Sequence, residues 1–146
     1  MPQAASIRAG DLIVADADAM ATILVVDDEF GISELLEALL TDEGHRVLTA
    51  TNGRQALERM TDARPDLVIS DLMMPVMDGA ALLHAMRERS DWREIPFVLM
   101  CALPELSIAD RVEGYDGFLR KPFRMDDVVR YVDRLLSERP GPHPAP

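Results

Sequence analysis

Three acidic residues and one lysine are the side chains of this sequence best suited to chemistry. Asp27 and Asp28 follow the apolar run 23–26, and Asp71 lies two residues after the apolar run 67–69. Lys121 is the only lysine among fifteen basic residues. Gathered carboxylates repel one another unless a cation shares their site, and Mg²⁺ is the hard cation that suits them. A metal and an ammonium on either side of an acid nucleophile would suit phosphoryl transfer.

The elements that must position these side chains alternate along the chain. Short apolar runs rich in β-branched residues predict strands, and apolar residues at a period of 3.6 predict helices. The predicted strands lie at 23–26, 47–48, 67–69, 97–100 and 118–119, and the predicted helices at 30–43, 52–62, 78–86, 104–113 and 125–138. Such alternation predicts a doubly wound α/β domain with a five-stranded parallel sheet. Its strand ends share one edge, so the four side chains can converge there.

Composition limits the class of protein. A chain of 146 residues suits one domain, and a formal charge of −11 argues against direct binding to nucleic acid or to an anionic membrane surface. One cysteine excludes an internal disulfide, and neither a membrane span nor a signal peptide is evident. We therefore expect a cytoplasmic protein. Residues 1–20 are expected to be a loosely ordered extension, 21–138 the domain, and 139–146 a proline-rich disordered tail.

Three motifs together resemble a known family. The segments VVDDE at 25–29, SDLMMPVMDG at 70–79 and LRKPF at 119–123 are similar to the receiver domain of two-component response regulators, which are CheY-like. The resemblance spans about residues 21–138. It implies a flavodoxin-like fold with five helices and strand order 2-1-3-4-5, which agrees with the alternation above.

The resemblance also implies roles for single residues. Asp71 would be the phosphoacceptor and also a metal ligand. Asp28 would bind Mg²⁺ directly, Asp27 would bind it through water, and the Met73 backbone carbonyl would complete the site. Lys121 would pair with a phosphoryl oxygen and precede a cis proline bond. The simpler alternatives are that Asp71 only opens a loop, and that Asp27 and Asp28 only cap a helix.

The sequence departs from the family at three places. Cys101 stands at the Thr/Ser switch position, where a thiol is the weaker hydrogen-bond donor, and Phe118 stands at the aromatic switch position without a phenolic oxygen. Cys101 is either a buried structural cysteine or a redox-sensitive one. A short segment between Cys101 and Lys121 predicts a shortened fourth helix. In the family, the side chains at the positions of Met73 and Leu103 influence the water that hydrolyses the aspartyl phosphate. Both residues are apolar here, which predicts slow autodephosphorylation.

The first interpretation is a stand-alone receiver that is phosphorylated on Asp71 with Mg²⁺ and catalyses only its own phosphorylation and slow dephosphorylation. Its expected partners are a sensor histidine kinase or phosphotransfer protein and a downstream protein target in trans. The alternative is a phosphorylation-independent adaptor with an impaired switch. A Mg²⁺-dependent phosphatase is disfavoured because such enzymes need a second acid two residues after the nucleophile, and that residue is Met73.

Overall fold

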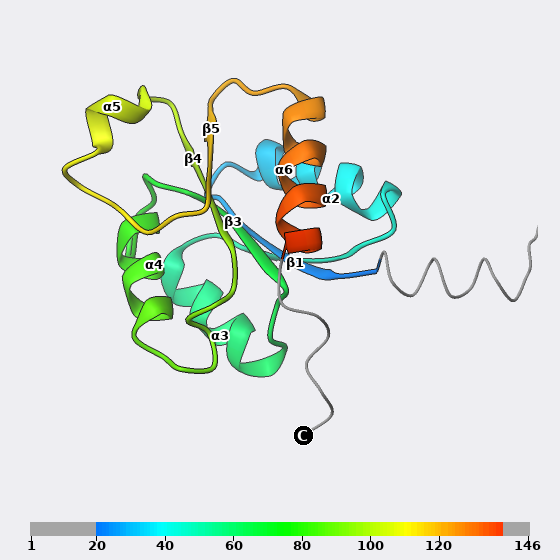
Figure 1. Cartoon of the computed structure of the whole chain (residues 1–146), viewed down its shortest axis with the longest axis horizontal. Coiled ribbons are helices and arrows are strands. Elements are labelled where there is room, and N and C mark those ends of the chain that lie inside the picture. The colour runs from blue at the N-terminus through cyan, green and yellow to red at the C-terminus, as the bar shows by residue number, and fades with distance from the viewer. Residues whose placement is uncertain (1–19, 139–146) are drawn as a thin grey trace, which may run out of the picture.

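The computed structural model describes residues 20–138, which form a five-stranded parallel sheet in the order β2-β1-β3-β4-β5 (Figure 1). The elements in chain order are β1 (Thr22–Val26), α2 (Phe30–Asp42), β2 (Arg46–Ala50), α3 (Gly53–Asp62), β3 (Leu67–Asp71), α4 (Gly79–Arg87), β4 (Phe97–Cys101), α5 (Glu105–Ile108), β5 (Gly117–Arg120) and α6 (Met125–Glu138). The predicted fold class and strand order are confirmed. The predictions for 1–19 and 139–146 lie outside the described residues.

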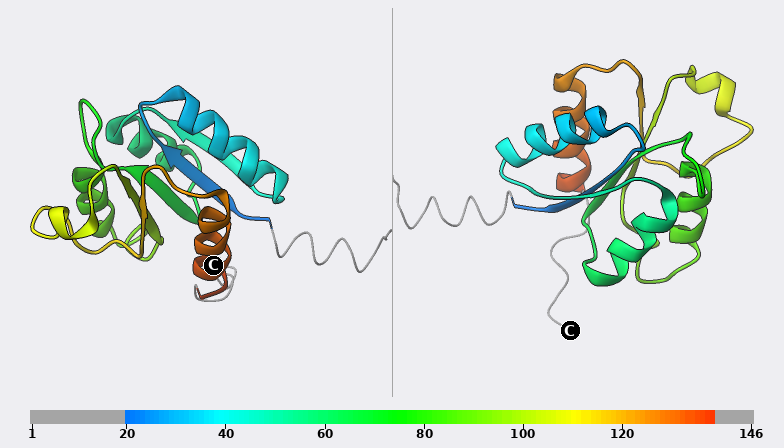
Figure 2. Two further views of the ribbon diagram at one scale, coloured as in Figure 1. Left: turned by 90° about the horizontal axis from the view of Figure 1, so that it is seen from above. Right: turned by 180° about the vertical axis from the view of Figure 1, so that it is seen from behind.

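Helices cover both faces of the sheet, and this explains why the strand sequences are continuously apolar. Leu24, Val26 and Val68 point to the face packed under α3 and α4, whereas Val25 and Ile69 point to the face under α2 and α6 (Figure 2). All five residues of β3 and of β4 are buried. The central strands are therefore fixed on both sides, and their carboxyl ends are rigid supports. Within residues 20–138 no helix is long and apolar enough to cross a bilayer.

Local hydrogen bonds start two of the helices where the sequence predicts. The Asn52 side chain accepts a bond of 2.9 Å from the Gln55 backbone N–H, and the Asp78 side chain accepts one of 2.8 Å from the Ala81 N–H. Each bond satisfies one of the backbone donors that a helix leaves open at its first turn. The Gln55 side chain in turn accepts from the backbone N–H of Thr51, one residue before the cap.

Helix α5 is short, as predicted, but it ends earlier than the predicted boundary at residue 113. It spans four residues and stops at Ile108, whose carbonyl then accepts from both Arg111 and Val112. One carbonyl serving two donors marks a change from helix to turn. Its first residue, Glu105, accepts a bond of 2.7 Å from the Tyr115 hydroxyl, so α5 is tied to the segment that leads into β5.

Gly79 allows the loop after β3 to return against the strand end. A Cβ at this position would overlap the backbone oxygen of Asp71 and would lie 3.0 Å from the Leu72 Cα, while the Gly79 N–H donates to the Leu72 carbonyl at 2.8 Å. Gly79→Ala should lower the free energy of unfolding by about 2 to 3 kcal/mol, because backbone must move to admit the methyl group. Urea unfolding followed by Trp92 fluorescence measures this loss.

Gly31→Ala is the matched control for that substitution. Gly31 lies in α2, and a Cβ there would meet nothing within 4 Å. The control should be neutral or should gain up to about 1 kcal/mol from helix propensity. Equal stabilities of the two alanine variants would contradict the assignment of Gly79 to close backbone packing.

Candidate functional site

The carboxyl ends of β1, β3 and β5 bring the predicted chemical residues together. Asp27 follows β1, Asp71 is the last residue of β3, and Lys121 follows β5. Oxygens of Asp27, Asp28 and Asp71 all lie within 4.8 Å of one another. The Lys121 ammonium lies 3.0 Å from an Asp27 oxygen and 3.3 Å from an Asp71 oxygen. The convergence inferred from parallel strands is therefore confirmed.

A further acid, which the sequence analysis did not assign, completes the lysine's surroundings. Glu29 Oε1 accepts a hydrogen bond of 2.9 Å from the Lys121 ammonium. Glu29 belongs to the VVDDE motif, but nothing in its spacing distinguishes it from an ordinary exposed glutamate at the start of a helix. The Lys121–Pro122 peptide bond is cis, as the resemblance implied.

The ammonium of Lys121 only partly offsets the charge of the buried acids. Burial and the charge of Asp27 raise the pKa of Asp71 to about 6, although Lys121 acts in the opposite direction. Burial likewise raises the pKa of Asp27 above its usual value, against the bonds it accepts from the Glu29 N–H and Lys121. Burial alone would lower the pKa of Lys121, but its bonds to Glu29 and Asp27 raise it. One ammonium does not fully compensate two buried carboxylates.

These residues fit a hard divalent cation. Three carboxylates offer oxygen ligands at a common point, two of them buried and that of Asp28 exposed to solvent. Mg²⁺ takes one or two carboxylates and keeps several waters, so an exposed ligand beside buried ones suits it. A shallow cavity of about 360 Å³ adjoins Asp28 and is lined also by Met73, Asp78 and Arg111. The donor set and the unrelieved charge of Asp71 therefore favour a magnesium site.

Comparison with known proteins decides the family. The family model described as the response regulator receiver domain matches residues 23–133. The chain belongs to the response regulator receiver family. A receiver domain of a histidine kinase from Syntrophus aciditrophicus has 34% sequence identity and a TM-score of 0.76, covering 86% of this chain and 98% of that chain.

Two further relatives of this receiver are informative. The receiver domain of sensor histidine kinase PA1611 from Pseudomonas aeruginosa has 26% identity and a TM-score of 0.76, covering 82% of this chain and 100% of that one, and it holds a magnesium ion in its active-site cleft. The probable transcriptional regulator ycf27 of Porphyra purpurea is 37% identical over 126 residues, which are 79% of this chain and 50% of that protein. The receiver thus spans about half the length of the curated relatives it matches first.

The remaining predicted site residues of the receiver lie around the acids rather than among them. Cys101 ends β4 and is fully buried, and its sulfur accepts from the Leu103 N–H at 3.3 Å. Phe118 is half-buried, with its ring centroid 6.1 Å from that of Tyr115. Met73 lies two residues after Asp71 with an exposed side chain. Cys101 lies at the carboxyl edge of the sheet, whereas Phe118 pairs with Leu99 in the middle of β4. The switching and ligand roles of the three residues stay predictions.

The loop that follows Asp71 contains a strained residue in this receiver. Val76 has φ of +70° and a side chain that is 74% exposed, and the Met77 N–H donates to the Pro75 carbonyl at 2.7 Å. A β-branched residue is unfavourable in this left-handed conformation. Val76→Asn should raise the free energy of unfolding by about 1 kcal/mol, because asparagine tolerates the conformation and little burial is lost.

Val76→Thr serves as the control, because threonine keeps the branched Cβ and therefore the strain. Chemical denaturation of the three proteins measures the difference. A threonine variant that is stabilised as much as the asparagine variant would show that polarity, and not backbone strain, sets the stability of this loop.

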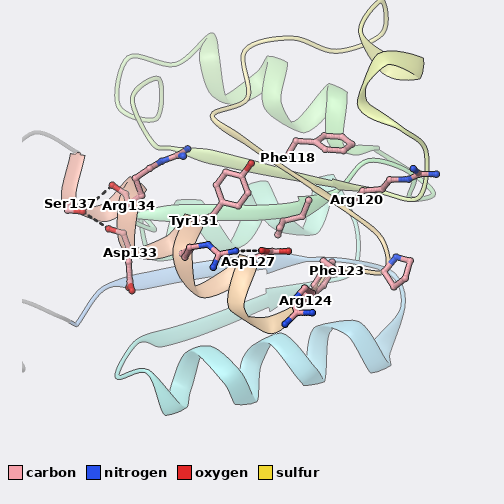
Figure 3. Close-up of a pocket in the computed structure, with 12 residues that line it drawn as sticks. Phe118, Arg120, Phe123, Arg124, Asp127, Tyr131, Asp133, Arg134 and Ser137 are labelled. Carbon is pink, nitrogen blue, oxygen red and sulfur yellow. Dashed lines mark hydrogen bonds and ion pairs between the residues drawn. The ribbon is translucent and has the colours of Figure 1, made fainter.

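A cavity between β5 and α6 lies away from the acids. It has a volume of about 950 Å³, and aromatic and arginine side chains line it (Figure 3). The Arg134 guanidinium lies 5.1 Å from the Tyr131 ring centroid, and Arg130 pairs with Asp127 across one turn of α6. Aspartates, a serine and a tyrosine also belong to this lining, which does not include Asp27, Asp28 or Asp71.

Proposed function

We propose that this receiver accepts a phosphoryl group on Asp71 in a Mg²⁺-dependent reaction and passes the signal on by protein contact. The observation that carries the proposal is the convergence of three carboxylates and one ammonium at the carboxyl edge of the sheet. The Asp71 carboxylate lies beside the other two acids and 3.3 Å from the Lys121 ammonium, which suits a phosphoacceptor. Asp27, Asp28, Asp71 and the Met73 backbone carbonyl are the proposed metal ligands, with Asp27 acting through water.

The chemistry assigned to this chain is simple. A carboxylate oxygen of Asp71 attacks the phosphorus atom of the donor, the bond from phosphorus to the donor breaks, and an aspartyl phosphate forms. Lys121 donates to a phosphoryl oxygen and offsets charge that the transfer brings into a partly buried site. A bound Mg²⁺ would supply further charge neutralisation. The chain therefore promotes its own modification and does not turn over a separate substrate.

The proposed partners follow from this role. A sensor histidine kinase or a phosphotransfer protein would supply the phosphoryl group, and a downstream protein would read it in trans. The cavity between β5 and α6 lies on the face that the family commonly uses for output, and the short α5 alters the neighbouring edge of that face. The net charge of −11 supports a protein target over nucleic acid or a membrane surface. A cytoplasmic location stays an expectation from composition.

Beryllofluoride, which mimics a phosphoryl group on aspartate, provides the test. Titration in Mg²⁺, followed by amide chemical shifts, should give saturable changes around Asp71 and along β4 and β5. Asp71→Asn should give none, whereas Asp110→Asn removes an equal charge from an exposed position and should behave as the wild type. Absence of binding in the wild-type protein would refute the proposed function.

A phosphorylation-independent adaptor is the second candidate, and Cys101 favours it. No residue of β4 carries a hydroxyl group, and the Cys101 thiol is a weak hydrogen-bond donor. An acyl phosphate at Asp71 therefore lacks the hydroxyl partner whose inward movement would carry the switch. The discriminating result is beryllofluoride binding at Asp71 with unchanged shifts along β5 and α6. Cys101→Thr should then extend the changes to those elements.

Autodephosphorylation of this receiver is expected to be slow. Met73 and Leu103 are both exposed at the mouth of the site and neither can orient a water molecule. Met73→Asn should shorten the lifetime of the phosphorylated form by roughly tenfold, less than the ~100-fold minimum typical of a general base, because an amide orients water without taking its proton. Phosphate release from the purified phosphorylated protein measures it, and a wild-type half-life of seconds would contradict the expectation.

A further inference from the structure

The Lys121 ammonium is surrounded by three carboxylates. It donates hydrogen bonds to Glu29 at 2.9 Å and to Asp27 at 3.0 Å, and it forms an ion pair with Asp71 at 3.3 Å. An ammonium group carries only three N–H bonds. A phosphoryl oxygen that arrives at Asp71 therefore competes with these acids for the ammonium.

The three acids differ in how easily they can release the lysine. The Asp27 side chain is fully buried and also accepts from the Glu29 backbone N–H, and the Asp71 side chain is 9% exposed. The Glu29 side chain is 63% exposed, so water can replace the lysine as its partner at little cost. Within residues 20–138, the Glu29 carboxylate forms its ion pair with Lys121.

The backbone of Glu29, and not its side chain, forms the first hydrogen bonds of α2. Its carbonyl accepts from the N–H groups of Ile32 and Ser33 at the start of α2, and its side chain makes no capping bond. A change confined to the side chain therefore leaves the helix start intact. This makes the ion pair testable without disturbing the fold.

We propose that Glu29 is a displaceable counter-ion that holds Lys121 in the resting receiver and competes with the phosphoryl group for its ammonium. Glu29 is thus a positioning residue that sets how readily Lys121 engages the modified Asp71. The inference rests on the proposed function. Its direction follows from charge, because an anionic phosphoryl group gains the ammonium only as the bond to Glu29 weakens, and it also meets the repulsion of that carboxylate.

Glu29→Gln is the test variant, because the amide keeps the shape and removes the charge. Glu34→Gln is the control. Glu34 is an exposed acid of α2, the helix that Glu29 precedes, and among the described residues it forms no ion pair with Lys121. Lys121 is the only lysine, so ¹⁵N-lysine labelling yields a single side-chain ammonium signal. In the metal-free protein this signal should move in Glu29→Gln and stay in place in Glu34→Gln.

Beryllofluoride affinity in saturating Mg²⁺ then measures the competition. Glu29→Gln should bind about fivefold more tightly than Glu34→Gln, the upper range for an exposed ion pair. Mg²⁺ affinity should be equal in the two variants. A general effect of the lost charge would change the affinities for Mg²⁺ and for beryllofluoride together. An unmoved ammonium signal, or beryllofluoride affinity that is equal or weaker in Glu29→Gln, would overturn the inference. Failure of the wild-type protein to bind beryllofluoride would instead overturn the proposed function beneath it.

Discussion

Replacing Lys121 with methionine should lower the free energy of unfolding by about 3 to 5 kcal/mol at neutral pH in the absence of Mg²⁺. The Lys121 side chain is 13% exposed and partly neutralises two buried carboxylates, those of Asp27 and Asp71. Removing one partner of a buried ion pair leaves charge that neither water nor protein compensates. Urea denaturation in a chelator, read by fluorescence of the buried Trp92, measures the loss.

The loss should be conditional in two ways. Saturating Mg²⁺ should restore much of it, because the cation replaces the missing ammonium beside the acids. The double variant Lys121→Met, Asp71→Asn should also recover stability, because it removes a carboxylate along with its partner. If neither Mg²⁺ nor the added Asp71→Asn substitution restored the stability lost in Lys121→Met, the lysine would act through packing and not through charge.

Asp71→Asn should abolish phosphorylation while making the metal-free protein more stable. The carboxylate is the proposed nucleophile, and an amide has no oxygen of comparable reactivity, so the rate should fall by at least about 1,000-fold. Incubation with acetyl phosphate and Mg²⁺, followed by separation of the phosphorylated form, measures this. Modification of the variant at the wild-type rate would remove Asp71 from the mechanism.

The stability gain of Asp71→Asn should depend on pH in a defined direction. The pKa of Asp71 is raised from 3.8 to about 6, so the folded state holds a proton that the unfolded state has lost between these values. Wild-type stability from this group is therefore full below pH 3.8 and falls as pH rises through about 6. The variant, which cannot titrate here, should match the wild type below about pH 4 and exceed it by about 2 to 3 kcal/mol above pH 7.

Denaturant unfolding across pH 3.5 to about 8 in a chelator tests that linkage. Mg²⁺ should shrink the difference at high pH, since it stabilises the ionised acids of the wild type. A difference that is constant with pH would show that the Asp71 carboxylate is not strained by its surroundings.

The strand ends and the meeting of their acids could be predicted from sequence because one geometric rule governs both. Apolar runs separated by helices require parallel strands, and parallel strands put Asp27, Asp71 and Lys121 at one edge whatever the details of the loops. The caps at Asn52 and Asp78 could also be predicted from sequence, since each depends on a residue and on an N–H three positions away.

Other features depend on contacts that spacing does not encode. The bond between Glu29 and Lys121 joins residues 92 apart and rests on the rotamer of an exposed side chain. The end of α5 at Ile108 was missed because the apolar pattern at 108, 109 and 112 fits a helix, whereas the chain buries Ile108 and Val112 through a turn instead. The positive φ of Val76 gave no sequence signal, because valine is not a residue that favours it.

Peptide mapping by mass spectrometry after incubation with acetyl phosphate tests the central claim most directly. With Mg²⁺, one phosphoryl group should appear on the peptide that contains Asp71, and it should be absent when the metal is chelated. Modification at another residue, or modification of Asp71 that is equally fast without a divalent cation, would contradict the assignment of these acids to a metal-assisted phosphoacceptor site.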